Sequence, residues 1–192
     1  NDKSNIQWLL SIGVPLEEAR SHCISGRLHS TVPGQTSPFD VLFISIAKCL
    51  ELTLHDGFDP RTGKQLGPKT GEFNQMHSYD DLIRSFKTQV ETFSKEGGAI
   101  ISEQKIARSQ VIPAMISSAF IEDCIKTGKG CLSDGARYNI IIQAPVGMID
   151  AADSLAAIKK CVFEDGTIGK QELMEALALN FKDKEPLRKL LI

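Results

Sequence analysis

The sequence lacks the features that mark membrane, exported and nucleic-acid-binding proteins. No apolar run in its 192 residues approaches the ~20 residues that a helix needs to cross a bilayer. A charged and apolar leader is also missing at the start of the chain, which begins at Asn1. The 22 basic and 24 acidic residues are interspersed, so no surface for nucleic acid or an anionic membrane is expected. These absences predict a cytoplasmic protein with neither membrane nor nucleic-acid partners.

Paired cysteines and metal-ligand spacings are missing as well. An odd number of cysteines at irregular spacing, without a Cys-x-x-Cys pair, argues against a disulfide framework and against a zinc site. We therefore expect reduced thiols and no bound metal. The five positions are Cys23, Cys49, Cys124, Cys131 and Cys161. The four histidines have neither zinc-type nor triad-type spacing, and the glycines match no phosphate-binding fingerprint.

One stretch mimics a calcium loop. From Cys161 to Glu172, glycine occupies the sixth position and glutamate the twelfth, as in an EF-hand. Calcium also needs oxygen ligands at the first and third positions, which here are Cys161 and Phe163. The pattern therefore indicates a plain helix–turn–helix with Thr167 or Gly169 near the start of the second helix.

The remaining pattern predicts a mostly helical chain with few strands. Ser78 is a helix cap, Gly57 and Gly128 close helices through left-handed backbone, and Gly97 and Gly98 separate two helices. Apolar periodicity and turn residues predict helices over 6–10, after Pro15, over 39–54, 80–94, 151–162 and 170–180 and from Pro186, a helical stretch through Pro113 to 126, loops over 25–38 and 59–71, and a buried strand over 138–143.

Several short motifs follow one another at characteristic spacings. They include Leu-His-Asp-Gly at 54–57, Gly-Ala-Arg-Tyr-Asn at 135–139 and Ala-Asp-Ser-Leu-Ala-Ala-Ile-Lys at 152–159. The full set lies at 13–20, 24–36, 50–57, 59–63, 67–71, 123–130, 134–139, 152–159, 172–177 and 180–181. In this order they resemble the C-terminal part of the catalytic barrel of the glycyl radical enzymes, the family of pyruvate formate-lyase. The likeness is to the branch of glycerol and diol dehydratases, choline lyase and arylacetate decarboxylases.

The resemblance implies an α/β fold, the second half of a ten-stranded α/β barrel wrapped in helices. It implies a partial catalytic domain over 1–192, with the cysteine-loop region at 21–36 and a barrel strand with helices at 137–192. The glycine radical domain of the family has no counterpart here, so the chain is expected to be a fragment. Exposed strand edges should make such a fragment aggregation-prone.

The resemblance also implies a radical reaction. In this family a glycyl radical takes a hydrogen atom from a cysteine, and the thiyl radical then takes one from a small organic substrate. A separate S-adenosylmethionine-dependent iron–sulfur activase installs the radical under anaerobic conditions, so this chain itself binds no cofactor. The expected activities are those of a lyase, dehydratase, decarboxylase or formate acetyltransferase-like transferase. A homodimer of the full-length protein stays open.

The loop that should carry the reactive cysteine departs from the family pattern. That loop reads Gly-Cys-x-Glu and then a Val-Pro-Gly-like turn, where this sequence has Gly26-Arg-Leu-His29 and Val32-Pro-Gly34. Arg27 thus stands at the position of the thiyl cysteine and His29 at that of the glutamate base. A guanidinium carries a permanent charge and no thiol hydrogen, whereas an imidazole can act as a base near neutral pH. Cys23 is expected to lie before the loop tip.

Two hypotheses follow for function. In the first, the chain is a fragment of a radical enzyme in which Arg27 is a sequence error or an inactivating change. In the second, it is a non-catalytic relative that binds a small molecule or a partner subunit. Either way this chain alone should be inactive. Tyr138 is either a substrate-pocket side chain or a core tyrosine with a satisfied hydroxyl.

Overall fold

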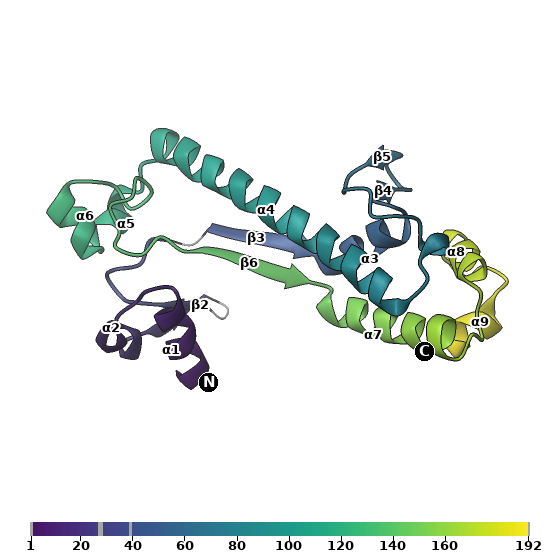
Figure 1. The fold of residues 1–192 in the computed structure, drawn as a ribbon. Helices are drawn as coiled ribbons and strands as arrows, with labels where there is room; N and C mark the ends of the chain where they lie inside the picture. The colour runs from purple at the N-terminus through teal and green to yellow at the C-terminus, as the bar shows by residue number, and fades with distance from the viewer. Residues whose placement is uncertain (1, 27–28, 39, 192) are drawn as a thin grey trace. The chain divides into compact units, whose positions relative to one another are not determined.

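The computed structural model describes residues 2–26, 29–38 and 40–191 and divides the chain into two compact units (Figure 1). Unit 1 comprises Asn1–Val41 and Ala99–Ile142, and unit 2 comprises Leu42–Gly98 and Gln143–Ile192. Within the described ranges, no helix is both long and apolar enough to span a membrane. All five cysteines are free.

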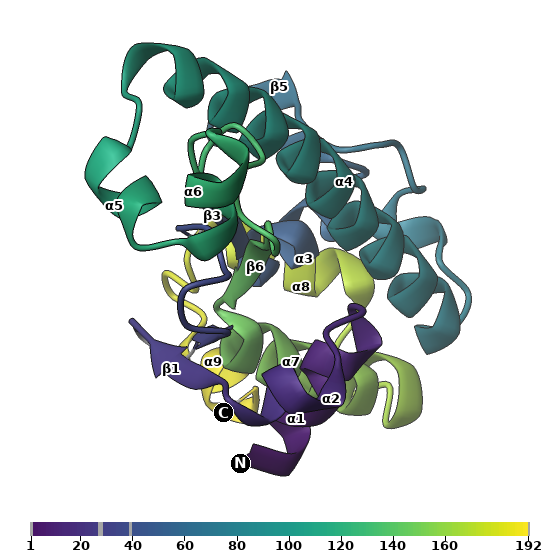
Figure 2. The same ribbon diagram turned by 90° about the vertical axis from the view of Figure 1, so that its left-hand side faces the viewer.

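Unit 1 is built from short elements. It holds α1 (Asp2–Ser11), α2 (Leu16–Arg20), β1 (Cys23–Ser25), β2 (His29–Thr31), α5 (Met115–Ala119) and α6 (Glu122–Thr127). Helices α1 and α2 pack against each other, as Figure 2 shows. Two small cores result: Leu9, Val14, Ala19 and Val32 form one, and Ile121, Cys124, Cys131, Leu132 and Ala136 form the other.

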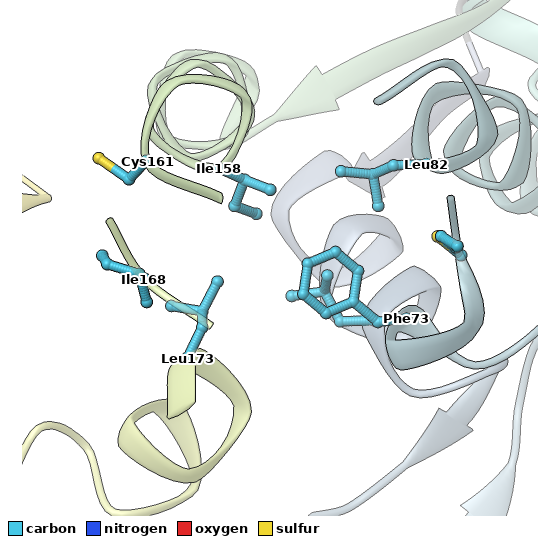
Figure 3. Packing of buried hydrophobic residues seen from close by; sticks show 8 residues of the cluster. Phe73, Leu82, Ile158, Cys161, Ile168 and Leu173 are labelled. Carbon is cyan, nitrogen blue, oxygen red and sulfur yellow. The ribbon is translucent and has the colours of Figure 1, made fainter. Parts of the chain in front are cut away.

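Unit 2 holds most of the longer helices. Its elements are α3 (Ile46–Leu54), β4 (Phe58–Asp59), β5 (Lys64–Gln65), the 3-10 turn η1 (Phe73–Gln75), α7 (Met148–Ile158), the π-helical turn η2 (Lys159–Glu164), α8 (Lys170–Ala178) and α9 (Glu185–Leu190). The core of this unit surrounds the ring of Phe73, which points toward Leu82, Ile158 and Leu173 in Figure 3.

Three elements pass from one unit into the other: β3 (Asp40–Ser45), α4 (Tyr79–Val111) and β6 (Ile141–Val146). Strand β3 pairs with β6, and both arrows in Figure 1 run toward the helices that follow them, α3 and α7. Helices α3 and α7 contact each other. Gly147 permits this packing, because its φ is +71° and a Cβ there would lie 3.2 Å from the Ala47 Cβ.

Most helix ends lie where the sequence places them. The hydroxyl of Ser78 accepts a hydrogen bond from the Asp81 N–H at 3.2 Å, and the α4 helix begins at the next residue. Gly57 and Gly128 have φ values of +78° and +66° after α3 and α6. Gly169 is the N-cap of α8. The helix–turn–helix interpretation of residues 161–172 fits this geometry.

Three predicted elements are wrong. Residues 40–45 of the predicted helix 39–54 form strand β3, and only the second half is helical, with the Ser45 hydroxyl accepting from the Lys48 N–H at 3.3 Å. A continuous apolar run suits a buried strand as well as a helix, so periodicity alone could not separate them. The predicted loop over 25–38 contains a β-hairpin instead. The stretch through Pro113 to 126 is broken into α5 and α6.

The predicted break at Gly97 and Gly98 is wrong as well. Helix α4 continues through both glycines to Val111. A Cβ on Gly97 would lie 2.3 Å from Leu42 Cδ2, so this glycine serves the close approach of β3 rather than a turn. The predicted strand 138–143 is found three residues later, at 141–146, and its side chains are half-buried or exposed rather than buried. A two-stranded sheet has little area with which to bury a face.

Candidate functional site

The cysteine-loop region forms the β1–β2 hairpin of unit 1. The strands are antiparallel, with Cys23 opposite Thr31 and Ser25 opposite His29. Ser25 and His29 are the last described pair of the hairpin, and Arg27 itself lies outside the described residues. Gly26 has φ +60°, a left-handed conformation that glycine adopts without strain. The described residues on either side of Arg27 thus belong to an antiparallel hairpin of defined register.

His29 is the first residue of β2 and is half-buried. A Cβ on Gly26 would lie 3.7 Å from the His29 Cδ2, so the imidazole packs beside the start of the hairpin tip. The strand register also places His29 in the last pair before that tip.

Cys23 lies in the hairpin stem, where its side chain is exposed. Its Sγ is 3.3 Å from the Thr31 Oγ1 across the strand pair. Because Ser25 and His29 form the last pair before the tip, Cys23 is two residues further back along β1. The expectation that it lies before the loop tip is confirmed.

A tight turn follows the hairpin at residues 32–37. The Val32 N–H donates to the Thr36 Oγ1 at 3.0 Å, and the Thr36 N–H donates back to the Val32 carbonyl at 3.1 Å. Gly34 has φ +71° and accepts from the Glu122 N–H at 2.9 Å through its carbonyl. The Val-Pro-Gly motif thus anchors the outgoing end of the hairpin to the start of α6.

Tyr138 fastens the same turn from a second segment. Its N–H donates to the Gln35 carbonyl at 3.1 Å, and its carbonyl accepts from the Ser37 N–H at 2.9 Å. Its hydroxyl donates to the Glu18 Oε2 at 2.6 Å, and its ring packs against the core of Leu9, Val14, Ala19 and Val32. Burial and this hydrogen bond raise the pKa of Tyr138, so the hydroxyl stays a donor at neutral pH.

Arg137 joins Glu18 to α6. Its Nε and Nη2 donate to the two carboxylate oxygens of Asp123 at 2.8 and 3.2 Å, and its Nη1 donates to the Glu18 Oε1 at 2.9 Å. Hydrogen bonding to Arg137 lowers the pKa of Asp123. We call Glu18, Asp123, Arg137 and Tyr138 the clasp, because they hold α2, α6 and the turn at 32–37 together. The carboxylates of the clasp were not predicted from the sequence, because they lie up to 120 positions from their partners.

The described residues hold no group of three or more histidine, cysteine or carboxylate side chains arranged for a metal ion. A cavity of about 770 Å³ lies in unit 2, where it is lined by none of Arg27, His29 and Tyr138. In unit 1, the hydrogen bonds described above hold the turn at 32–37 against α2, α6 and Tyr138.

Comparison with known proteins identifies the family to which this architecture belongs. The family model described as pyruvate formate lyase-like matches residues 1–192. Trans-4-hydroxy-L-proline dehydratase of Clostridioides difficile is 35% identical over 97% of this chain and 24% of its own length. The 4-hydroxyphenylacetate decarboxylase glycyl radical subunit of Clostridium scatologenes is 33% identical over 88% of this chain and 21% of its own length.

The structural likeness is equally extensive. The glycerol-bound B12-independent glycerol dehydratase of Clostridium butyricum has a TM-score of 0.92 and 36% identity, over 99% of this chain and 24% of the dehydratase chain. The chain therefore belongs to the pyruvate formate-lyase-like family of glycyl radical enzymes. It spans about a quarter of the length of these relatives. The predicted fold class, part of the α/β barrel of this family, is confirmed.

Proposed function

We propose that residues 1–192 are a segment of the catalytic barrel domain of a longer glycyl radical enzyme. The observation that carries the proposal is the 36% identity and TM-score of 0.92 to a glycerol dehydratase across 99% of the chain. The parent reaction would be radical cleavage of a C–O, C–C or C–N bond in a small organic substrate. Dehydration is the first candidate, because dehydratases are among the relatives with the highest identity.

The substitutions in the hairpin bear on whether this chain supports that reaction. The family's relay needs an S–H bond at position 27, and an arginine side chain has only N–H bonds and a permanent positive charge. His29 retains a group that can accept a proton near neutral pH. We therefore infer that this chain is inactive, with Arg27 as the decisive change and His29 as a tolerable one.

Restoring the thiol tests this proposal. The full-length protein and its Arg27→Cys variant would be activated under anoxia with the cognate activase and S-adenosylmethionine, then offered glycerol, propane-1,2-diol and trans-4-hydroxy-L-proline. We expect product from the Arg27→Cys variant alone. As a matched control, Arg20→Cys introduces a thiol in α2 rather than at position 27 and should give none. Equal turnover by the unmodified protein would contradict the role given to position 27.

The second candidate is a non-catalytic relative that acts as a binding or partner subunit. It is favoured by the departure of Arg27 and His29 together from the family's Gly-Cys-x-Glu pattern. Electron paramagnetic resonance separates the candidates, because formation of the glycyl radical does not need the hairpin cysteine. A doublet signal from the activated full-length protein supports the enzyme, and its absence beside an activated dehydratase control supports the binding subunit.

Several properties of the parent enzyme belong to the same proposal. A glycine outside this chain would carry the radical, and a separate activase containing an iron–sulfur cluster would install it from S-adenosylmethionine. The protein would work in an anaerobic cytoplasm, which suits its five free thiols. A homodimer is the assembly proposed for the full-length protein. Sedimentation of that protein would test the homodimer directly.

A further inference from the structure

Unit 2 contains a cavity that no part of the proposed radical chemistry uses. Its volume is about 770 Å³, within the range of small-molecule sites. Aliphatic and aromatic side chains from α3, α7 and α8 and the segment after α8 make up most of its wall. They include Leu50, Leu54, Ile158, Leu173, Leu177 and Phe181. Such a wall suits the apolar body of a ligand.

A β-hairpin forms one edge of this cavity. Strands β4 and β5 pair through Asp59 and Lys64, so residues 60–63 form the tip, which brings Pro60 and Arg61 to the cavity. Asp59 is only 1% exposed, and its Oδ1 accepts from the Arg61 N–H at 3.2 Å. The same carboxylate accepts from the Lys48 Nζ at 2.6 Å. The Asp59 carboxylate therefore holds the Arg61 N–H at the edge of the cavity.

Two arginines at the cavity, Arg61 and Arg188, could bind an anionic group of a ligand. Arg61 makes no ion pair among the described residues, and Arg188 has only a 3.5 Å contact with a neighbouring glutamate. Glu51 also lines the cavity, and the Lys48 ammonium lies 2.5 Å from its carboxylate and 2.6 Å from that of Asp59, so Lys48 offsets only one of these two negative charges. Burial lowers the pKa of His55, so this imidazole is neutral at pH 7. Asp153 is the remaining charged group of the wall.

We propose that this cavity is a binding site for an organic carboxylate with an apolar body, a site separate from the hairpin of unit 1. Arg61 and Arg188 hold the carboxylate by charge-assisted hydrogen bonds, which suit the planar guanidinium. The apolar body lies against Leu50, Leu173 and Leu177. The carboxylates of Asp153 and Glu51 repel the anion and therefore weaken its binding.

Naphthalene-1-acetate and its primary amide are suitable probes, since they share shape and differ in charge. Isothermal titration of the full-length protein should show at least about fivefold tighter binding of the carboxylate than of the amide. Arg61→Gln should weaken carboxylate binding about ten- to a hundredfold, the loss expected for one hydrogen bond to a charged group. Asp153→Asn should strengthen carboxylate binding. Neither variant should change binding of the amide.

Two controls keep the result specific. Arg84→Gln removes an arginine of unit 2 that is 76% exposed and does not line the cavity, so the affinity should stay unchanged. Leu177→Asp places an acid on the apolar wall at a residue that is already 40% exposed, so it should abolish binding without unfolding the protein. Circular dichroism verifies the fold of each variant.

Three results would overturn the proposal. The first is equal affinity for the carboxylate and the amide. The second is an affinity that the Arg61 and Asp153 substitutions leave unchanged. The third is binding by the 192-residue chain but not by the full-length protein, which would assign the cavity to a segment of the protein's own chain.

Discussion

Replacing Phe73 by alanine tests the packing of unit 2. The ring is 1% exposed and meets Phe163 edge-on, with centroids 6.2 Å apart at an interplanar angle of 80°. Truncating a buried phenylalanine costs about 3–5 kcal/mol through lost transfer energy and the cavity left behind. The aromatic pair accounts for about 0.5–1.5 kcal/mol of that loss. A domain of ordinary stability has about 5–15 kcal/mol in total, so the variant should be clearly weakened.

Native-state hydrogen exchange is the appropriate assay, because it resolves the two units. Amides of α4 near Leu82 and of α7 near Ile158 should lose protection from exchange in the Phe73→Ala variant. Trp8 lies in unit 1, so its fluorescence should stay unchanged. Phe120→Ala makes the same deletion at a ring that is 77% exposed and should stay within about 0.5 kcal/mol of the parent. A loss below about 1 kcal/mol for Phe73→Ala would refute the described core.

Three further perturbations test other contacts. Hydrogen bonding to Lys48 holds the pKa of Asp59 well below its ordinary value of 3.8. The ionised carboxylate therefore contributes its full stabilisation above pH 3.8, and this contribution is lost as the pH falls toward the pKa of the folded state. Asp59→Asn should therefore be less stable at pH 7, by a margin that shrinks in acid, as urea midpoints would measure. Gly57→Ala should cost about 2–3 kcal/mol, because φ is +78° and the new Cβ would lie 2.4 Å from a backbone oxygen. Arg137→Lys should speed hydrogen exchange of the turn at 32–37, since lysine cannot form the two-point contact of the clasp.

Each of these has its own check. A constant difference between the Asp59 proteins across the acid range would show that the carboxylate is not what stabilises β4 and β5. Gly63→Ala shares a positive φ, +67°, but no atom lies within 4 Å of the new Cβ, so it should cost only about 1 kcal/mol. Unchanged hydrogen exchange at residues 32–37 in the Arg137→Lys variant would show that the clasp does not stabilise this turn.

Local signals in the sequence account for many of the helix ends. Ser78, Gly128 and Pro186 act through their own backbone and side-chain geometry, so their neighbours suffice to interpret them. Gly97 shows the limit of this approach, because its role is set by Leu42 on another element. Strand β3 shows a second limit, because a continuous apolar run has no periodicity that distinguishes a strand from a helix.

In the candidate site as well, local motifs could be predicted from the sequence and long-range contacts could not. Arg27, His29 and Tyr138 were found because short motifs around them resemble a family. The hairpin register and the clasp depend on contacts between residues as far apart as Glu18 and Tyr138, which no local pattern encodes. The structure also gives the Tyr138 hydroxyl a partner in Glu18, which favours the core tyrosine over a free pocket donor. A role for Tyr138 in substrate binding stays a prediction.

Turnover by the Arg27→Cys variant of the full-length protein tests the central claim most directly. After anoxic activation of both proteins, we expect a glycyl radical signal in each and product from the Arg27→Cys variant alone. A radical signal in both with product from the unmodified Arg27 protein would contradict this claim, because position 27 would then not be the site of hydrogen transfer.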